Sequence, residues 1–292
     1  MTQRREWIHG WLLLLPALVL LFAFTHLPAI RTIWDSFYST ARGRRPSRFV
    51  GFDNYEHMLS DPTFWKVLTN NLWFALGTIP LSIAIALAMA LWVNGRIRGR
   101  SFLRMAYFTP TVLPLIAVAN IWLFFYTPGF GLLDQVSAAL LGAGQSNLLG
   151  DPDTALGAVM VVTIWKEAGF FMIFYLAALQ TIPPSLVEAA RIEGAGRWTI
   201  FRRIVFPLLM PTTLFVSVNA VINSFRLVDH LFILTGGGPD NASSLLLFYI
   251  YETAFRFWDT AYAATLTVVM LVLLSVLAIG QFFLFDRRVH YR

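Results

Sequence analysis

Five stretches of this 292-residue chain, each at least 22 residues long, contain no Asp, Glu, Lys or Arg. They are Trp7–Ile30, Val67–Gly95, Met105–Leu133, Ile204–Phe225 and Thr260–Phe285. About 20 consecutive apolar residues are enough for a helix to cross a bilayer. A sixth stretch, roughly Ala155–Leu179, is apolar apart from Lys166 and Glu167. The sequence therefore predicts an all-α, polytopic membrane protein with six transmembrane helices.

The composition agrees with a membrane protein and excludes several other classes. Hydrophobic residues make up 57% of the chain and charged residues 13%, whereas soluble domains are about a quarter charged. The net charge of +6 does not indicate nucleic-acid binding, because the basic residues lie between apolar blocks rather than on one face. The absence of cysteine excludes disulfides and thiolate metal sites.

The distribution of basic residues predicts the orientation. If both termini are cytoplasmic, 13 arginines lie on the cytoplasmic side and eight basic residues lie outside. The positive-inside rule therefore favours cytoplasmic termini. The cluster Arg42–Arg48 is a local exception, and the sequence offers no reason for it. In the same outer loop, Asp53–Leu68 predicts an amphipathic helix on the membrane surface.

No catalytic or metal-binding pattern is visible. The two lysines, Lys66 and Lys166, each follow a tryptophan, so a Walker A motif with Gly-Lys is absent. The five histidines are scattered, and no two lie four residues apart as a helical metal site would require. We therefore expect neither enzymatic activity nor a bound metal or other cofactor in this chain.

The loop between the fourth and fifth spans, residues 181–207, carries more structure than a connector needs. Pro183 and Pro184 stop the incoming helix. Ser185 and Glu188 fit a capping box, in which each side chain bonds the other residue's backbone amide. The sequence therefore predicts a short helix that begins at this box.

The short helix is predicted to end near Glu193, where Gly194 and Gly196 supply a break. A second helix is predicted to begin at Trp198 and to enter the next span at Pro207. A short exposed helix between two spans is typical of a docking element for a cytoplasmic partner.

The loop resembles the EAA loop of the permease subunits of binding-protein-dependent ABC importers. The matching residues are Glu188-Ala189-Ala190, Gly194, Ile204 and Pro207, and Phe206 replaces the usual leucine. Three other segments resemble carbohydrate-type permeases, such as those for maltose and glycerol 3-phosphate. They are Phe49–Tyr55, Pro128–Leu133 and Leu234–Pro239.

The resemblance implies a single permease domain over residues 1–292 in the cytoplasmic (inner) membrane of a prokaryote. Its coupling helix would dock on an ATPase through Glu188, Ala189, Ala190, Gly194 and Gly196. The partners it implies are a second homologous permease, two ATPase subunits that bind ATP and Mg²⁺, and an extracytoplasmic solute-binding protein. A sugar or related polyol would be the substrate.

Charged residues within a span indicate a function, because each costs roughly 2.5–3.5 kcal/mol to insert. Thr163, Lys166, Glu167 and Phe170 recur at helical spacing and are predicted to share one face. In the maltose permease that the chain resembles, the segment at and after the tryptophan matching Trp165 helps to line the sugar cavity. The alternative for these residues is a structural contact with the partner permease.

The fifth span repeats this pattern with Asn219, Asn223 and Arg226. These residues are further candidates for the substrate cavity. Asparagines also join transmembrane helices, and an arginine near a helix end extends its side chain to the membrane surface. Both interpretations stay open from sequence alone.

The sequence leaves three functions to be compared. The first is a permease subunit for a sugar or polyol. The second is an importer for a glycerol phosphate ester, in which Lys166 and Arg226 would serve the anion. The third is a self-sufficient secondary transporter, which would have no use for a docking loop.

Overall fold

The computed structural model describes residues 2–95, 98–141, 147–226 and 228–286. The chain divides into two compact units, one formed by residues 1–61 and 250–272 and the other by residues 62–249 and 273–292. Within the described residues the regular structure is helical, apart from two isolated β-bridges. The predicted all-α fold class is confirmed.

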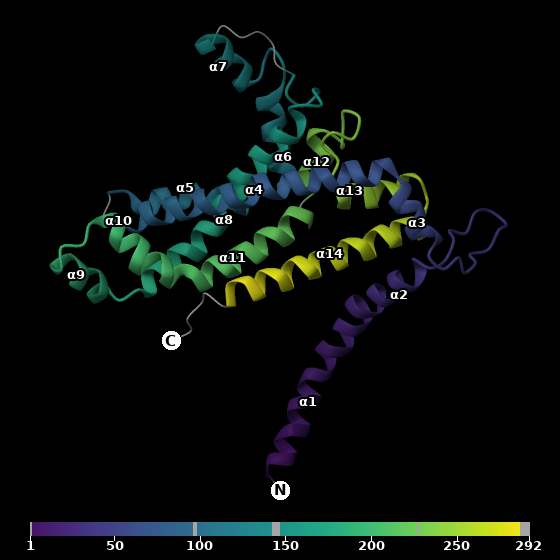
Figure 1. Cartoon of the computed structure of the whole chain (residues 1–292), viewed down its shortest axis with the longest axis horizontal. Helices are drawn as coiled ribbons and strands as arrows, with labels where there is room; N and C mark the ends of the chain where they lie inside the picture. Colours follow the sequence, from purple (N-terminus) through teal and green to yellow (C-terminus); the bar gives the residue numbers. More distant parts are fainter. Residues whose placement is uncertain (1, 96–97, 142–146, 227, 287–292) are drawn as a thin grey trace. The chain divides into compact units, whose positions relative to one another are not determined.

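The first unit begins with a long helical arm. α1 (Thr2–Leu21), the π-helical turn η1 (Phe22–His26) and α2 (Leu27–Asp35) follow one another without interruption (Figure 1). The part from Gly10 to Asp35 is long and apolar enough to cross a membrane, and its most apolar window has no buried residue. A helix that is apolar on all sides and uncovered by its own chain is typical of a membrane span. The predicted first span lies in this arm.

The segment Asp53–Leu68, predicted as one surface helix, is divided between two helices. α3 (Asp53–Ser60) ends before Asp61, whose ψ of 111° is extended, and α4 (Pro62–Asn94) begins immediately afterwards. A residue before proline avoids helical backbone angles, and proline itself suits the first position of a helix. The prediction of a single helix is wrong, because Pro62 ends one helix and begins the next.

Side-chain hydrogen bonds hold the rest of the first unit together. It contains η3 (Glu252–Arg256) and the beginning of α14 (Thr260–Asp286). The Tyr262 hydroxyl donates to Asp61 at 2.8 Å, and the Thr265 hydroxyl donates to the Ser36 carbonyl at 3.3 Å. These bonds join residues more than 200 positions apart in the sequence.

Three long helices form the centre of the second unit. α4, α8 (Ala155–Thr181) and α11 (Phe206–Arg226) pack against one another (Figure 1). Ala86 and Ala90 of α4 are fully buried one turn apart, so this helix approaches its neighbours closely. The residues buried with them are Phe171, Met172, Tyr175, Leu176, Leu179, Leu209, Val216 and Ala220.

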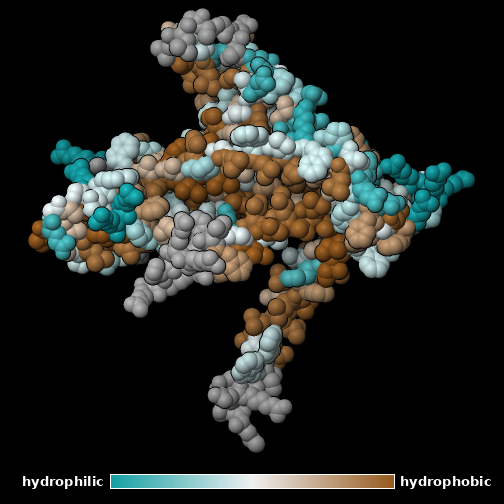
Figure 2. All heavy atoms as spheres, in the orientation of Figure 1, coloured by the Kyte–Doolittle hydropathy of each residue, from teal (hydrophilic) through white to brown (hydrophobic). Residues whose placement is uncertain are grey.

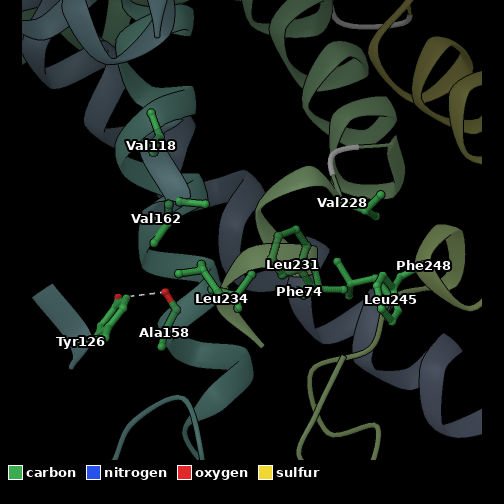
Figure 3. Close-up of a cluster of buried hydrophobic side chains, with 12 residues drawn as sticks. Phe74, Val118, Tyr126, Ala158, Val162, Val228, Leu231, Leu234, Leu245 and Phe248 are labelled. Atoms are coloured by element: carbon green, nitrogen blue, oxygen red, sulfur yellow. Dashed lines mark hydrogen bonds between the residues drawn. The ribbon is translucent and has the colours of Figure 1, made fainter. Parts of the chain in front are cut away.

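A second cluster of buried side chains joins α8 to more irregular parts of the chain (Figure 3). It uses α12 (Asp229–Leu234) and residues around the beginning of α13 (Leu246–Tyr251). The Tyr126 hydroxyl donates to the Ala158 carbonyl at 2.9 Å, so this buried phenol is satisfied. The labelled members are Phe74, Val118, Tyr126, Ala158, Val162, Val228, Leu231, Leu234, Leu245 and Phe248.

The third predicted span is broken. α5 (Arg100–Val112) and α6 (Leu115–Tyr126) meet at an angle of 101°. Leu113 and Pro114 between them are extended, with ψ of 136° and 138°. The prediction of one continuous helix over Met105–Leu133 is wrong, because Pro114 removes a backbone donor and disfavours helical angles at the residue before it. A further helix, α7 (Leu132–Leu141), follows α6.

The number of spans depends on how this bend is counted. The described residues contain five helices long and apolar enough to cross a membrane, or six if α5 and α6 form one broken span. The other four predicted spans correspond to α4, to α8, to the π-helical turn η2 (Phe201–Val205) together with α11, and to α14.

Candidate functional site

The four residues of α8 that were predicted to share one face lie in two different environments. Thr163 and Glu167 are buried and line a small pocket between α4, α8 and α11. Lys166 and Phe170 are half-buried and line no part of that pocket. The spacing places the four residues on one broad face of α8. Different neighbouring helices pack against different parts of this face, so the four side chains do not share one site.

A carboxylate–amide pair lies at the centre of the pocket. The Asn223 side-chain amide of α11 donates to Glu167 of α8 at 2.7 Å. Thr78 and Ser82 of α4 also line the pocket, and the Ser82 hydroxyl is buried with no hydrogen-bond partner among the described residues. The volume of the pocket is about 10 Å³, about enough for one water molecule. The pocket is therefore lined mostly by polar side chains and is too small for a larger ligand.

A buried histidine extends this polar cluster, and the sequence analysis missed it. His230 of α12 is fully buried, and its Nε2 lies 3.0 Å from the Thr163 hydroxyl. The Nδ1 atom has no hydrogen-bond partner among the described residues. The scattered histidines gave no signal for this contact, since it joins residues 67 positions apart and depends on how α12 packs.

Lys166 of α8 forms hydrogen bonds with backbone carbonyls at the bend between α5 and α6. Its ammonium donates to the Leu113 carbonyl at 2.6 Å and to the Pro110 carbonyl at 3.1 Å. A helix that stops inside an apolar span leaves its last carbonyls without donors, and these need partners from elsewhere. The ammonium group of Lys166 therefore stabilises the bend of the third span.

Close packing of α5 on α8 accompanies this contact. Gly169, one turn after Lys166, is buried, and a Cβ built on it would overlap the backbone carbonyl oxygen of Tyr107. Only glycine leaves room for the two backbones at this separation. The close approach positions Lys166 against the bend.

The other predicted cavity residues lie outside the pocket. Phe170 packs on Phe171 and Phe174, with ring centroids 5.6 and 5.1 Å away. The Asn219 amide donates to the Phe215 carbonyl of its own helix at 2.8 Å. Arg226 is exposed at the end of α11. Of the three candidates on α11, the structure brings only Asn223 to Glu167.

The predicted docking loop folds as α9 (Pro184–Ile192), followed by α10 (Arg197–Ile200) and the π-helical turn η2 (Phe201–Val205). The predicted capping box is wrong. Pro183 occupies the N-cap position and no side chain caps the helix, so Ser185 falls inside the first turn. The prolines set the beginning of α9 through their backbone angles, because proline suits the first helical position.

The predicted break at the end of α9 is confirmed. Gly194 has a φ of 82°, the left-handed conformation that residues with a Cβ rarely adopt. The Ala195 amide donates to the Ala190 carbonyl at 2.9 Å and the Gly194 amide donates to the Arg191 carbonyl at 3.0 Å. This pair of bonds is a Schellman motif, which ends the helix and turns the chain. Gly196, in extended conformation, then begins α10.

α9 presents most of the predicted docking residues on its surface. Glu188, Ala189, Gly194 and Gly196 are exposed, and Ala190 is buried. Glu188 and Arg191 line a groove of about 430 Å³ with Asn94 and Gln180 from the ends of α4 and α8. The loop also exposes Ile192 to 88%.

A bundle of apolar spans with a small pocket of polar side chains and an exposed helical connector is typical of a membrane-embedded transport subunit. The chain belongs to the family of binding-protein-dependent transport system inner membrane components, whose sequence profile matches residues 78–291. It is thus a permease subunit of an ABC importer, located in the membrane, and a separate ATPase subunit hydrolyses ATP.

Several relatives match nearly the full length. The lactose transport system permease protein LacF of Rhizobium radiobacter is 34% identical, with 94% of this chain and 93% of the relative covered. The trehalose/maltose transport system permease protein MalF of Thermococcus litoralis is 32% identical, with 95% of each covered. The sn-glycerol-3-phosphate transport system permease protein UgpA of Brucella abortus biovar 1 is 33% identical, with 96% of each covered.

A solved structure shares the fold. It is a bacterial ABC transporter involved in the import of the acidic polysaccharide alginate, with a TM-score of 0.85 and 22% identity. The similarity covers 97% of this chain and 96% of that chain. A second structure of an alginate transporter, in complex with its periplasmic protein bound to an alginate pentasaccharide, gives a TM-score of 0.86.

Proposed function

We propose that this chain forms one half of the membrane pathway of an importer for a neutral sugar or polyol. The observation that supports the proposal is that the two charged residues of α8, Lys166 and Glu167, have different surroundings. Lys166 is hydrogen-bonded to two backbone carbonyls, whereas Glu167 and Asn223 line a small pocket. A carboxylate and an amide suit the hydroxyl groups of a sugar, because they accept and donate hydrogen bonds without requiring a charge on the ligand.

The small volume of the pocket implies a change of conformation during transport. About 10 Å³ excludes a sugar, so α8 and α11 must separate before Glu167 and Asn223 meet a substrate. Their hydrogen bond would then be exchanged for bonds to substrate hydroxyls. In this proposal Thr163 is a neighbouring polar group, and Phe170, Asn219 and Arg226 lie outside the first contacts.

A glycerol phosphate ester is the second candidate. The similarity to a glycerol-3-phosphate permease supports it. An anion would require a free cation, and Lys166 would have to leave the Pro110 and Leu113 carbonyls to serve as one. That exchange would leave two carbonyls unsatisfied within a span, at about 1–3 kcal/mol each, which favours the neutral substrate.

We also propose that α9 is the coupling helix and that both termini are cytoplasmic. Residues 181–207 form the coupling loop of a single permease domain over residues 1–292. The exposed Glu188, Ala189 and Gly194 contact the ATPase, which binds ATP and Mg²⁺, and this chain holds no cofactor of its own. A second permease subunit completes the pathway, and an extracytoplasmic binding protein delivers the substrate.

Transport by the reconstituted complex tests the substrate. Liposomes holding the complex are supplied with lactose, maltose, trehalose or glycerol 3-phosphate, each with a binding protein that carries it. Asn223→Ala is compared with Asn219→Ala, the same change one turn earlier at a side chain bonded to its own helix. We expect Asn223→Ala alone to alter selectivity or the apparent KM. Equal effects of the two variants would contradict the proposed site.

Labelling of single cysteines tests the orientation, since the chain has no native cysteine. Ser101 and Ser47 are both exposed. A cysteine at Ser101 should react with a membrane-impermeant reagent from the cytoplasmic side, and one at Ser47 from the outside. The opposite pattern would invert the proposed topology and remove α9 from contact with an ATPase.

A further inference from the structure

The arginine cluster Arg42–Arg48, for which the sequence offers no reason, lies on a hairpin of the first unit. Backbone bridges pair Tyr38 with Phe49 and Arg42 with Arg45, and Gly43 turns the chain between the inner pair. In Figure 2 this hairpin is a hydrophilic projection at the right of the view. Its arginines are exposed, and no acidic residue lies between residues 38 and 49.

The hairpin has an ordered base. The Asn54 side-chain amide donates to the carbonyls of Ser36 and Tyr38, at 2.8 and 2.9 Å. The Tyr38 and Phe49 rings meet edge to face at 5.5 Å. A scaffold fixed in this way reduces the conformational entropy that its arginines would lose on binding a partner.

One face of the hairpin borders a polar hollow of about 520 Å³. Arg42 donates to Asp259 at 2.8 Å, and the same carboxylate also accepts bonds from the Thr40 hydroxyl and the Tyr262 amide. Asp259 is thus already hydrogen-bonded within the protein. The guanidinium groups of Arg45 and Arg48 line the same hollow without an ion pair among the described residues.

An exposed tryptophan lies next to this acid in the sequence. Trp258 is 72% exposed and has a φ of 55°. A bulky side chain in the left-handed region costs of order 1–3 kcal/mol, and such residues gather at functional sites. Arginine and tryptophan are also the residues most enriched among those that dominate the energy of protein interfaces.

We propose that this hairpin is the docking surface for an acidic face of the solute-binding protein. The proposal rests on the proposed function, since it requires residues 36–61 to lie outside the cytoplasm. Guanidinium groups bind carboxylates through paired hydrogen bonds. Lipid phosphate offers similar chemistry, and the test below separates it from a protein. The polar hollow and the exposed tryptophan favour a protein.

The test measures binding of the solute-binding protein to the whole transporter complex in nanodiscs, at low and at physiological salt. Arg45→Gln/Arg48→Gln removes the two charges that line the hollow without an ion pair, and Arg98→Gln/Arg100→Gln removes two exposed charges from the connection predicted to be cytoplasmic. We expect the hairpin variant to raise Kd at low salt roughly tenfold and to weaken its salt dependence. The control variant should bind as the wild type does. Arg45→Lys/Arg48→Lys should retain the salt dependence.

Three results would overturn the inference, and they are distinguishable. A hairpin variant that binds with wild-type affinity and salt dependence removes the docking role alone. A hairpin variant that loses only its preference for phosphatidylglycerol over phosphatidylcholine nanodiscs assigns the hairpin to lipid. A wild-type complex that does not bind the solute-binding protein overturns the proposed function and the inference with it.

Discussion

Two glycines of α8 give a matched test of the packing that holds the broken span. Gly169 faces the Tyr107 backbone carbonyl of α5, and an added Cβ would overlap that oxygen. Gly157, three turns earlier on the same helix, is exposed and has no atom within 4 Å of an added Cβ. Alanine at these two positions therefore makes the same chemical change in opposite environments.

We expect the two substitutions to change the free energy of unfolding in opposite directions. Alanine in place of an unconstrained helical glycine stabilises by about 0.5–1 kcal/mol, and we expect this gain for Gly157→Ala. Gly169→Ala receives the same gain but must separate two helices, and overpacking of this kind costs about 1–3 kcal/mol. The obstructing atom belongs to a backbone and cannot rotate away, so we expect a net loss of about 1–2 kcal/mol.

Thermal unfolding of the purified complex in detergent, followed by intrinsic fluorescence, measures the difference. One kcal/mol corresponds to about 2–4 °C in Tm for chains of roughly this size. Gly157→Ala should raise Tm slightly, and Gly169→Ala should lower it by several degrees. Shifts of the same sign and size would refute the close approach of α5 and α8 and the positioning of Lys166 that depends on it.

Three further changes test the bend and the docking loop. Lys166→Met removes the donor to the Pro110 and Leu113 carbonyls. Each carbonyl left unsatisfied costs about 1–3 kcal/mol, and removing a charge from the span offsets part of this cost, so we expect a lower Tm. An unchanged Tm would contradict this role. Glu188→Ala should leave stability within about 0.5 kcal/mol, since α9 has no side-chain cap, while uptake falls. A large loss of stability would show that Glu188 supports the helix. Gly194→Asp should abolish uptake in liposomes and Gly194→Ala should reduce it less, because both strain the backbone but only aspartate adds charge; wild-type transport by Gly194→Asp would refute the docking assignment.

Local chemistry accounts for the features that sequence predicted correctly. Long uncharged stretches predict spans because an apolar helix satisfies its own backbone in lipid, whatever lies beside it. The end of α9 was also predictable because it depends only on local residues. Gly194 takes the left-handed conformation that ends the helix within one turn, without contacts from distant residues. The capping box failed because a competing local signal, the proline pair, sets the beginning of the helix.

The partners of the polar residues were not predictable, because they come from other helices. Spacing places Lys166 and Glu167 side by side on α8, and only packing sends one to the bend of α5 and α6 and the other to Asn223. His230 meets Thr163 only because α12 folds against α8.

Sequence alone therefore determined the membrane class, the approximate positions of the spans, the short helix of residues 181–207 and its family resemblance, since each depends on a continuous run of residues. Tertiary structure decided the contact of Lys166 with the carbonyls at the bend, the small pocket around Glu167 and the hollow beside the arginine hairpin. In each of these places a charged or polar group is satisfied by a residue far away in the chain, and periodicity carries no information about such a contact.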